Sequence, residues 1–85
     1  MPDYNAIIST IPDGHSQVKT PDVSYRIIKQ QLSSSSVFVE AHGSDGSYIS
    51  FNYYPTLSTN RIKPCEMPIE DVHKFLDISA KNMFQ

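Results

Sequence analysis

Histidine and cysteine are the side chains of this sequence best suited to metal binding or nucleophilic catalysis. The chain has three histidines, His15, His42 and His73, and one cysteine, Cys65. They form no Cys-x-x-Cys, His-Glu-x-x-His or His-x-x-x-His motif, and Cys65 lies eight residues before His73. Closely spaced ligands are the usual sequence signature of a zinc site. We therefore expect no metal site and interpret the histidines as chance placements.

Other catalytic arrangements have no better support. Serine, histidine and aspartate all occur, but twelve serines in 85 residues make their presence uninformative. There is no Gly-x-Ser-x-Gly turn, and the three glycines do not form a phosphate-binding loop. We interpret Cys65 as a small, semi-buried hydrophobic residue. We expect no catalytic residues and no cofactor, and the alternative is a small enzyme that uses Cys65 or a histidine.

Aromatic residues between positions 37 and 54 indicate a binding surface instead. Alternation along two predicted strands brings aromatic and polar side chains onto one face of a hairpin. Aromatic residues, and tyrosine in particular, are enriched at protein interfaces. The predicted protein-binding residues are Phe38, Glu40, His42, Tyr48, Asn52 and Tyr54. The alternative is that another segment covers these side chains, or that they are ordinary exposed aromatics.

The hairpin over residues 37–54 is the element that must position this surface. A two-residue Asp-Gly turn would pair Val39 with Asn52 and mix apolar with polar side chains. A three-residue loop, residues 44–46, pairs Val39 with Phe51 and gives one uniformly apolar face. In that loop Gly46 would adopt the left-handed conformation. The predicted inward residues are Val37, Val39, Ala41, Ile49, Phe51 and Tyr53.

A helix is predicted at each end of the chain. Tyr4, Ile7, Ile8 and Ile11 have the spacing of an amphipathic helix, although the β-branched residues also allow a strand. Asp3 can cap this helix and Pro12 can end it. The C-terminal helix begins at Pro68, where proline is favoured. Its predicted inner stripe is Ile69, Val72, Phe75, Leu76, Ser79, Ala80 and Met83.

The segments between these elements give weaker signals. We predict a loop at His15–Thr20, a serine-rich turn at Ser33–Ser36 and a loop at Pro55–Met67. Residues 21–32 fit either a helix capped by Thr20 or a strand. We favour a strand because a two-stranded sheet is marginal. The predicted fold class is thus α+β: a short N-terminal helix, an antiparallel three-stranded sheet with the hairpin 37–54, and a C-terminal helix packed on one face.

Composition limits the functional classes. A chain of 85 residues is expected to form a single small domain, residues 1–85. Its net charge of −2, without a basic stripe, disfavours nucleic acid and anionic membranes as partners. A single cysteine cannot form an intramolecular disulfide, so we expect a reducing, cytoplasmic location. The sequence has no apolar run of about 20 residues and no signal-peptide pattern at its start.

These observations predict a small non-enzymatic protein-binding module, a regulator or inhibitor that acts through the hairpin. The order helix, three strands, helix resembles the layout of double-stranded RNA-binding domains, so a nucleic-acid-binding domain of αβββα layout is the alternative. Those domains have a basic start to the last helix, whereas residues 68–71 here are acidic. Small acidic phage-encoded inhibitors share a similar layout. A homodimer formed through the open sheet edge is a further alternative.

Overall fold

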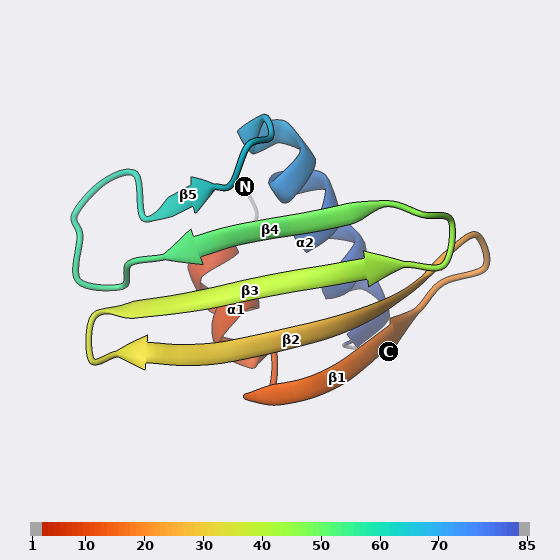
Figure 1. Cartoon of the computed structure of the whole chain (residues 1–85), viewed down its shortest axis with the longest axis horizontal. Coiled ribbons are helices and arrows are strands. Elements are labelled where there is room, and N and C mark those ends of the chain that lie inside the picture. Colours follow the sequence, from red (N-terminus) through yellow and green to blue (C-terminus); the bar gives the residue numbers. More distant parts are fainter. Residues whose placement is uncertain (1–2, 84–85) are drawn as a thin grey trace.

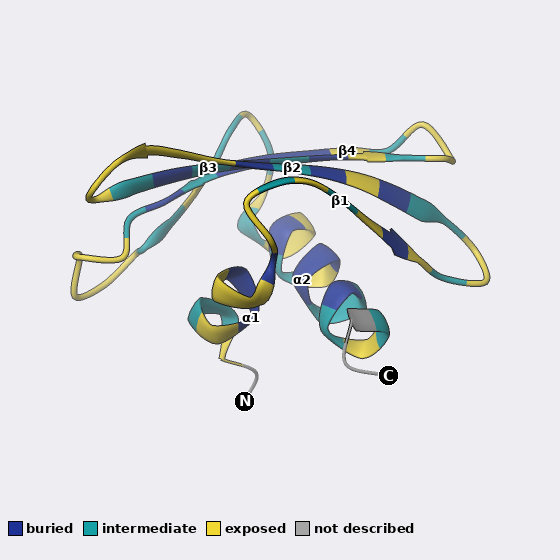
Figure 2. Ribbon diagram, turned by 90° about the horizontal axis from the view of Figure 1, so that it is seen from below, coloured by how far each residue is buried: buried dark blue, intermediate teal, exposed yellow. Residues whose placement is uncertain are grey.

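A five-stranded antiparallel sheet forms one layer of the protein, and two helices form the other (Figures 1 and 2). The computed structural model describes residues 3–83. Each strand pairs with the next one along the chain, in the order β1-β2-β3-β4-β5. The strands are β1 (Gly14–Lys19), β2 (Ser24–Ser33), β3 (Ser36–Gly43), β4 (Tyr48–Tyr53) and β5 (Ile62–Pro64), and the helices are α1 (Tyr4–Thr10) and α2 (Ile69–Met83). Both helices lie on the same face of the sheet.

The β3–β4 hairpin has the predicted register. Val39 lies opposite Phe51, and both side chains are fully buried. The backbone N–H of Gly43 donates to the carbonyl of Ser47 at 2.8 Å and closes a three-residue loop. Gly46 adopts a φ of +88°, the left-handed conformation that this loop needs. All six residues predicted to point inward are buried.

The N-terminal helix also follows its prediction. The carboxylate of Asp3 accepts the backbone N–H of Ala6 at 3.2 Å and caps α1. Ile7 and Ile8 are buried within the helix, and Ile11 is buried just after its end. The helix ends before Pro12, because a proline disfavours helical geometry at the residue that precedes it.

Helix α2 begins directly after Pro68 and covers the inner face of the sheet. Val72, Phe75, Leu76 and Ser79 of the predicted stripe are buried. Phe75 packs edge-on against Tyr25 of β2, with the ring centroids 5.1 Å apart. Ile69 and Ala80 are partly buried, and the side chain of Met83 lies outside the described residues.

The prediction of three strands is wrong, because two segments expected to be loops form edge strands. β1 overlaps most of the predicted loop His15–Thr20 and begins one residue before it. Only Val18 among its residues is both apolar and buried, so the strand has almost no hydrophobic pattern. β5 is three residues long and includes Pro64, which is tolerated at a sheet edge where one N–H is not needed. β1 and β5 form the two edges of the sheet.

Residues 21–32 contain most of β2, which agrees with the favoured strand. Tyr25 and Ile27 point toward the helices and are buried. Thr20, which would have capped the alternative helix, caps a turn instead. Its hydroxyl accepts the backbone N–H groups of Asp22 and Val23 at 3.2 and 2.9 Å and directs the chain from β1 into β2.

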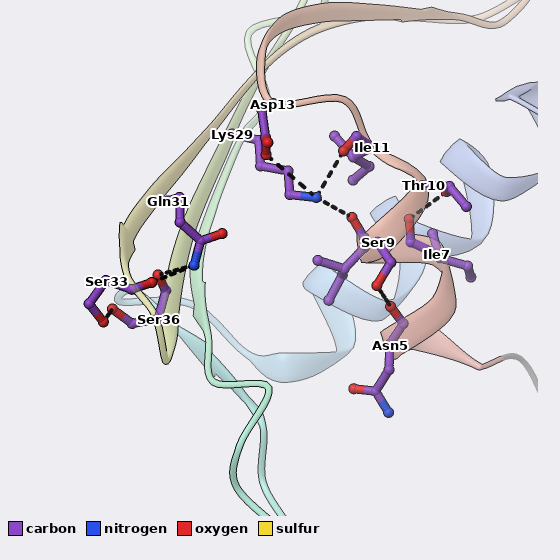
Figure 3. Close-up of polar contacts among 11 residues, drawn as sticks. Asn5, Ile7, Ser9, Thr10, Ile11, Asp13, Lys29, Gln31, Ser33 and Ser36 are labelled. Atoms are coloured by element: carbon purple, nitrogen blue, oxygen red, sulfur yellow. Dashed lines mark hydrogen bonds and ion pairs between the residues drawn. The ribbon is translucent and has the colours of Figure 1, made fainter.

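A buried lysine connects α1 to the sheet. Lys29 follows Ile27 on the inner face of β2, and its ammonium donates to the carbonyls of Ile8 and Ile11, each at 2.9 Å (Figure 3). These carbonyls lie at the C-terminal end of α1, where the helix dipole is negative, and the Ile8 carbonyl also accepts the backbone N–H of Ile11 at 3.2 Å. A helix of seven residues is too short to be stable alone, so it depends on such contacts.

Substitution of Gly46 tests the hairpin loop. Gly46→Ala is expected to destabilise the protein by about 1 kcal/mol, because a Cβ disfavours the left-handed conformation. The space around Gly46 is open, so the cost is conformational and not a steric clash. Gly46→Asn is the matched control and should recover part of the loss, since asparagine tolerates this conformation. Urea unfolding measures both, and equal stability of all three proteins would contradict the loop assignment.

Candidate protein-binding surface

No described helix covers the face of the sheet opposite α1 and α2 (Figure 2). We call this the outer face. Strand alternation and the observed register place one set of side chains there. The set includes His15, Gln17, Lys19, Ser24, Arg26, Ile28, Gln30, Phe38, Glu40, His42, Tyr48, Ser50, Asn52 and Lys63. The outer face is therefore a surface of five strands, broader than the predicted hairpin.

A contacting cluster of Glu40, His42 and Tyr48 occupies the β3–β4 part of the outer face. The hydroxyl of Tyr48 donates to Oε2 of Glu40 at 3.0 Å. Nε2 of His42 lies 3.9 Å from Oε1 of the same carboxylate. The rings of His42 and Tyr48 are 4.8 Å apart between centroids and inclined by 56°. The only acidic side chain within the outer-face set is thus already engaged by two neighbours.

The Glu40 carboxylate raises the pKa of the Tyr48 phenol above its ordinary value. The main cause is the hydrogen bond from Tyr48 to Glu40, because deprotonation would remove the donor and bring two negative charges together. Tyr48 therefore remains a neutral donor across the physiological pH range. Its side chain is 46% exposed, which makes it the most exposed aromatic residue of the described strands.

The turn after β5 borders the outer face beside β4. The backbone N–H of Cys65 donates to the carbonyl of Ser50 at 3.0 Å. The side-chain amide of Asn52 lies 3.7 Å from the Cys65 sulfur and donates to it. Ser50 is only 3% exposed, although its position is on the outer face. The turn after β5 therefore packs against this side of the outer face.

Phe38 and Ile28 supply the apolar part of the outer face. Phe38 lies opposite Gln30 on β2 and Asn52 on β4, and Ile28 lies opposite Glu40. Both side chains are partly exposed. Tyr54, the sixth predicted residue, follows the end of β4, is half-buried, and has no contact with the other five among the described side-chain interactions.

Basic side chains complete this surface. They come from β1 and β5, which were not predicted, and from β2, for which the sequence also allowed a helix. Lys19 comes from β1, Arg26 from β2 and Lys63 from β5, and all three are exposed. Glu40 is the one acid of the outer-face set, so the face is positive while the whole chain has a net charge of −2. The alternation of His15, Gln17 and Lys19 with Ser16 and Val18 is the sequence signal that could have identified β1.

A concave region, separate from the outer face, lies where the N-terminal ends of α1 and α2 meet the β4–β5 connection. It is an open hollow of about 620 Å³. The rings of Tyr4 and His73 stack inside it, with centroids 4.3 Å apart and planes inclined by 3°. Burial and the nearby Asp77 carboxylate raise the pKa of Tyr4. The loop residues that complete its rim are Ser58, Thr59 and Asn60, which are exposed, and Arg61, which is partly buried.

Within residues 3–83, no three histidine, cysteine, aspartate or glutamate side chains lie close enough together to hold a metal ion. None of the described helices has the length and apolar character needed to cross a membrane. Comparison with models of known protein families, with curated proteins and with solved structures gives no match to this chain. The function must therefore be inferred from the surface itself.

The contact between Glu40 and Tyr48 can be tested by titration. Glu40→Gln removes the ionised acceptor and should lower the pKa of Tyr48 toward its ordinary value. The ¹³Cζ chemical shift of each tyrosine, followed by NMR from pH 8 to 12, measures this directly. Asp71→Asn, which removes an exposed acid from α2, is the control and should leave the Tyr48 titration unchanged. An unaltered pKa in Glu40→Gln would show that the hydrogen bond is absent in solution.

Proposed function

We propose that this protein is a non-enzymatic binding module, a small regulator or inhibitor, whose outer face binds an acidic segment of another protein. The observation that carries the proposal is the composition of the outer face. This face is uncovered by the helices and combines partly exposed apolar side chains with Lys19, Arg26 and Lys63. Aromatic residues and arginine are the types most often responsible for binding energy at protein interfaces.

The distribution of charge supports an acidic partner. The basic side chains of the outer face lie on β1, β2 and β5, around the hairpin cluster. The Glu40 carboxylate is engaged by Tyr48 and lies beside His42, so it offers little repulsion to an approaching acidic group. Complementary charge increases the association rate and fixes the orientation of a partner. Ile28 and Phe38, between these charges, provide the apolar contact.

Nucleic acid is the alternative partner for the same side chains, since bases can stack on exposed aromatic rings. The helix, three strands, helix order that resembled double-stranded RNA-binding domains is not the observed order, because the sheet has five strands. Lys19 and Lys63 lie on the two opposite edge strands, so the basic side chains form no continuous basic stripe of the kind that follows a phosphate backbone. These features favour a protein partner, and the experiment below separates the two classes.

Affinity purification with matched variants tests the proposal. The wild-type protein, Arg26→Glu, Phe38→Ala and Lys74→Glu are immobilised and exposed to lysate of the source cells, with and without nuclease. Lys74→Glu makes the same charge reversal on the exposed side of α2 and is the control. We expect Arg26→Glu and Phe38→Ala each to reduce recovery of a specific partner at least tenfold, while Lys74→Glu retains it.

Two further measurements decide the outcome. Increasing salt from 50 to 500 mM should weaken binding of an acidic partner, because exposed charges are screened. The recovered partner should shift the NMR signals of β2, β3 and β4 that belong to the outer face. Equal recovery by all four proteins would exclude the outer face, and loss of the partner on nuclease treatment would assign the face to nucleic acid.

A further inference from the structure

A second, smaller hollow lies on the helix side of the sheet, away from the outer face. It is bounded by the C-terminal end of α1, the inner face of β2 and β3, and the chain after β4, and it has a volume of about 360 Å³. Ile8, Val37, Tyr53 and Pro55 form its apolar walls. Lys29 lines the same hollow, together with Gln31 and Ser9. Its size is in the range of sites that hold small molecules.

The Lys29 ammonium has one more donor than it uses inside the protein. An ammonium carries three N–H groups. Two of them are taken by the carbonyls of Ile8 and Ile11, each at 2.9 Å. The next acceptor is Oδ1 of Asp13 at 4.0 Å, which is beyond hydrogen-bond distance (Figure 3). The Asp13 side chain is 78% exposed, whereas that of Lys29 is 10% exposed.

This arrangement places a buried positive charge with an unused donor beside a hollow that has both apolar and polar walls. The helix carbonyls neutralise Lys29 only partly, since each carries a partial charge. A full negative charge at the third donor would complete the coordination of the ammonium and form a charge-assisted hydrogen bond. Asp13 approaches this position without reaching it, so a ligand anion has to displace it.

We propose that the hollow beside Lys29 binds a carboxylate attached to a small apolar group. The carboxylate accepts the third N–H of Lys29, and the apolar group packs against Ile8, Val37 and Tyr53. Asp13 acts as an internal competitor that holds the site partly occupied when no ligand is bound. The site is separate from the outer face, and its ligand need not affect the protein partner proposed above.

NMR titration with sodium hexanoate tests this site, with hexan-1-ol as the neutral probe of similar length. We expect saturable shifts with hexanoate at residues 8–11, Lys29 and Tyr53, and at least tenfold weaker binding of hexan-1-ol. N-acetyl-Gly-Leu and its C-terminal amide are tested in parallel. Stronger binding of the peptide acid than of hexanoate would identify a protein C-terminus as the source of the carboxylate. Stronger binding of hexanoate would identify a free carboxylic acid.

Variants make the test specific to Lys29. Asp13→Asn should tighten hexanoate binding at least threefold because it removes the competing charge, while Asp22→Asn, beyond the other end of β1, should leave it unchanged. Lys29→Met should abolish binding, and Ser9→Phe should do so by filling the hollow while the α1 contacts of Lys29 remain. Equal binding of hexanoate and hexan-1-ol, no saturable shift, or unchanged affinity in Asp13→Asn would each overturn the proposal.

Discussion

The contact of the Lys29 ammonium with the end of α1 is the polar interaction on which the attachment of α1 to the sheet depends. A lysine on the inner face of a sheet is costly to bury unless its charge is satisfied. Here the carbonyls of Ile8 and Ile11 each accept a hydrogen bond from the ammonium, and the Ile8 carbonyl also accepts the backbone N–H of Ile11. The contact stabilises both groups: the ammonium gains acceptors for its N–H groups, and the negative end of the α1 dipole gains a nearby positive charge. The position of α1, and of the hollow beside it, follows from this contact.

The helix layer divides the sheet into two faces of different composition. The inner face is apolar apart from a few residues such as Lys29 and Ser16, and it packs on α1 and α2. The outer face can then carry side chains that lie outside the buried core, such as Arg26 and Phe38. Because side chains alternate along every strand, burial of one set automatically displays the other. The candidate binding surface is thus a direct consequence of the packing beneath it.

The sequence predicted the hairpin and both helices because their hydrophobic patterns are strong. The register of Val39 against Phe51 followed from the need for one uniform apolar face. β1 and β5 could not be recognised in the same way, because β1 buries a single apolar side chain and β5 spans three residues. These two edge strands form because β2 and β4 offer free backbone groups for them to pair with. The sequence gives no sign that Lys29 is buried, because its acceptors lie 21 and 18 residues earlier and contact it only in the folded protein.

The same limits apply to the candidate binding surface. Five of its six predicted residues lie on the outer face, and Tyr54 follows the end of β4. The basic residues Lys19 and Lys63 were not assigned to it because they come from the unpredicted strands.

The strand order has a consequence for folding. Each strand pairs with its neighbour in sequence, so the sheet forms through short loop closures that cost little chain entropy. Contacts of α1 with α2 and with Lys29 instead join segments far apart in sequence. We expect the meander to assemble first and α1 to dock last. The same segment should then be the first to open in native-state hydrogen exchange, ahead of the central strands.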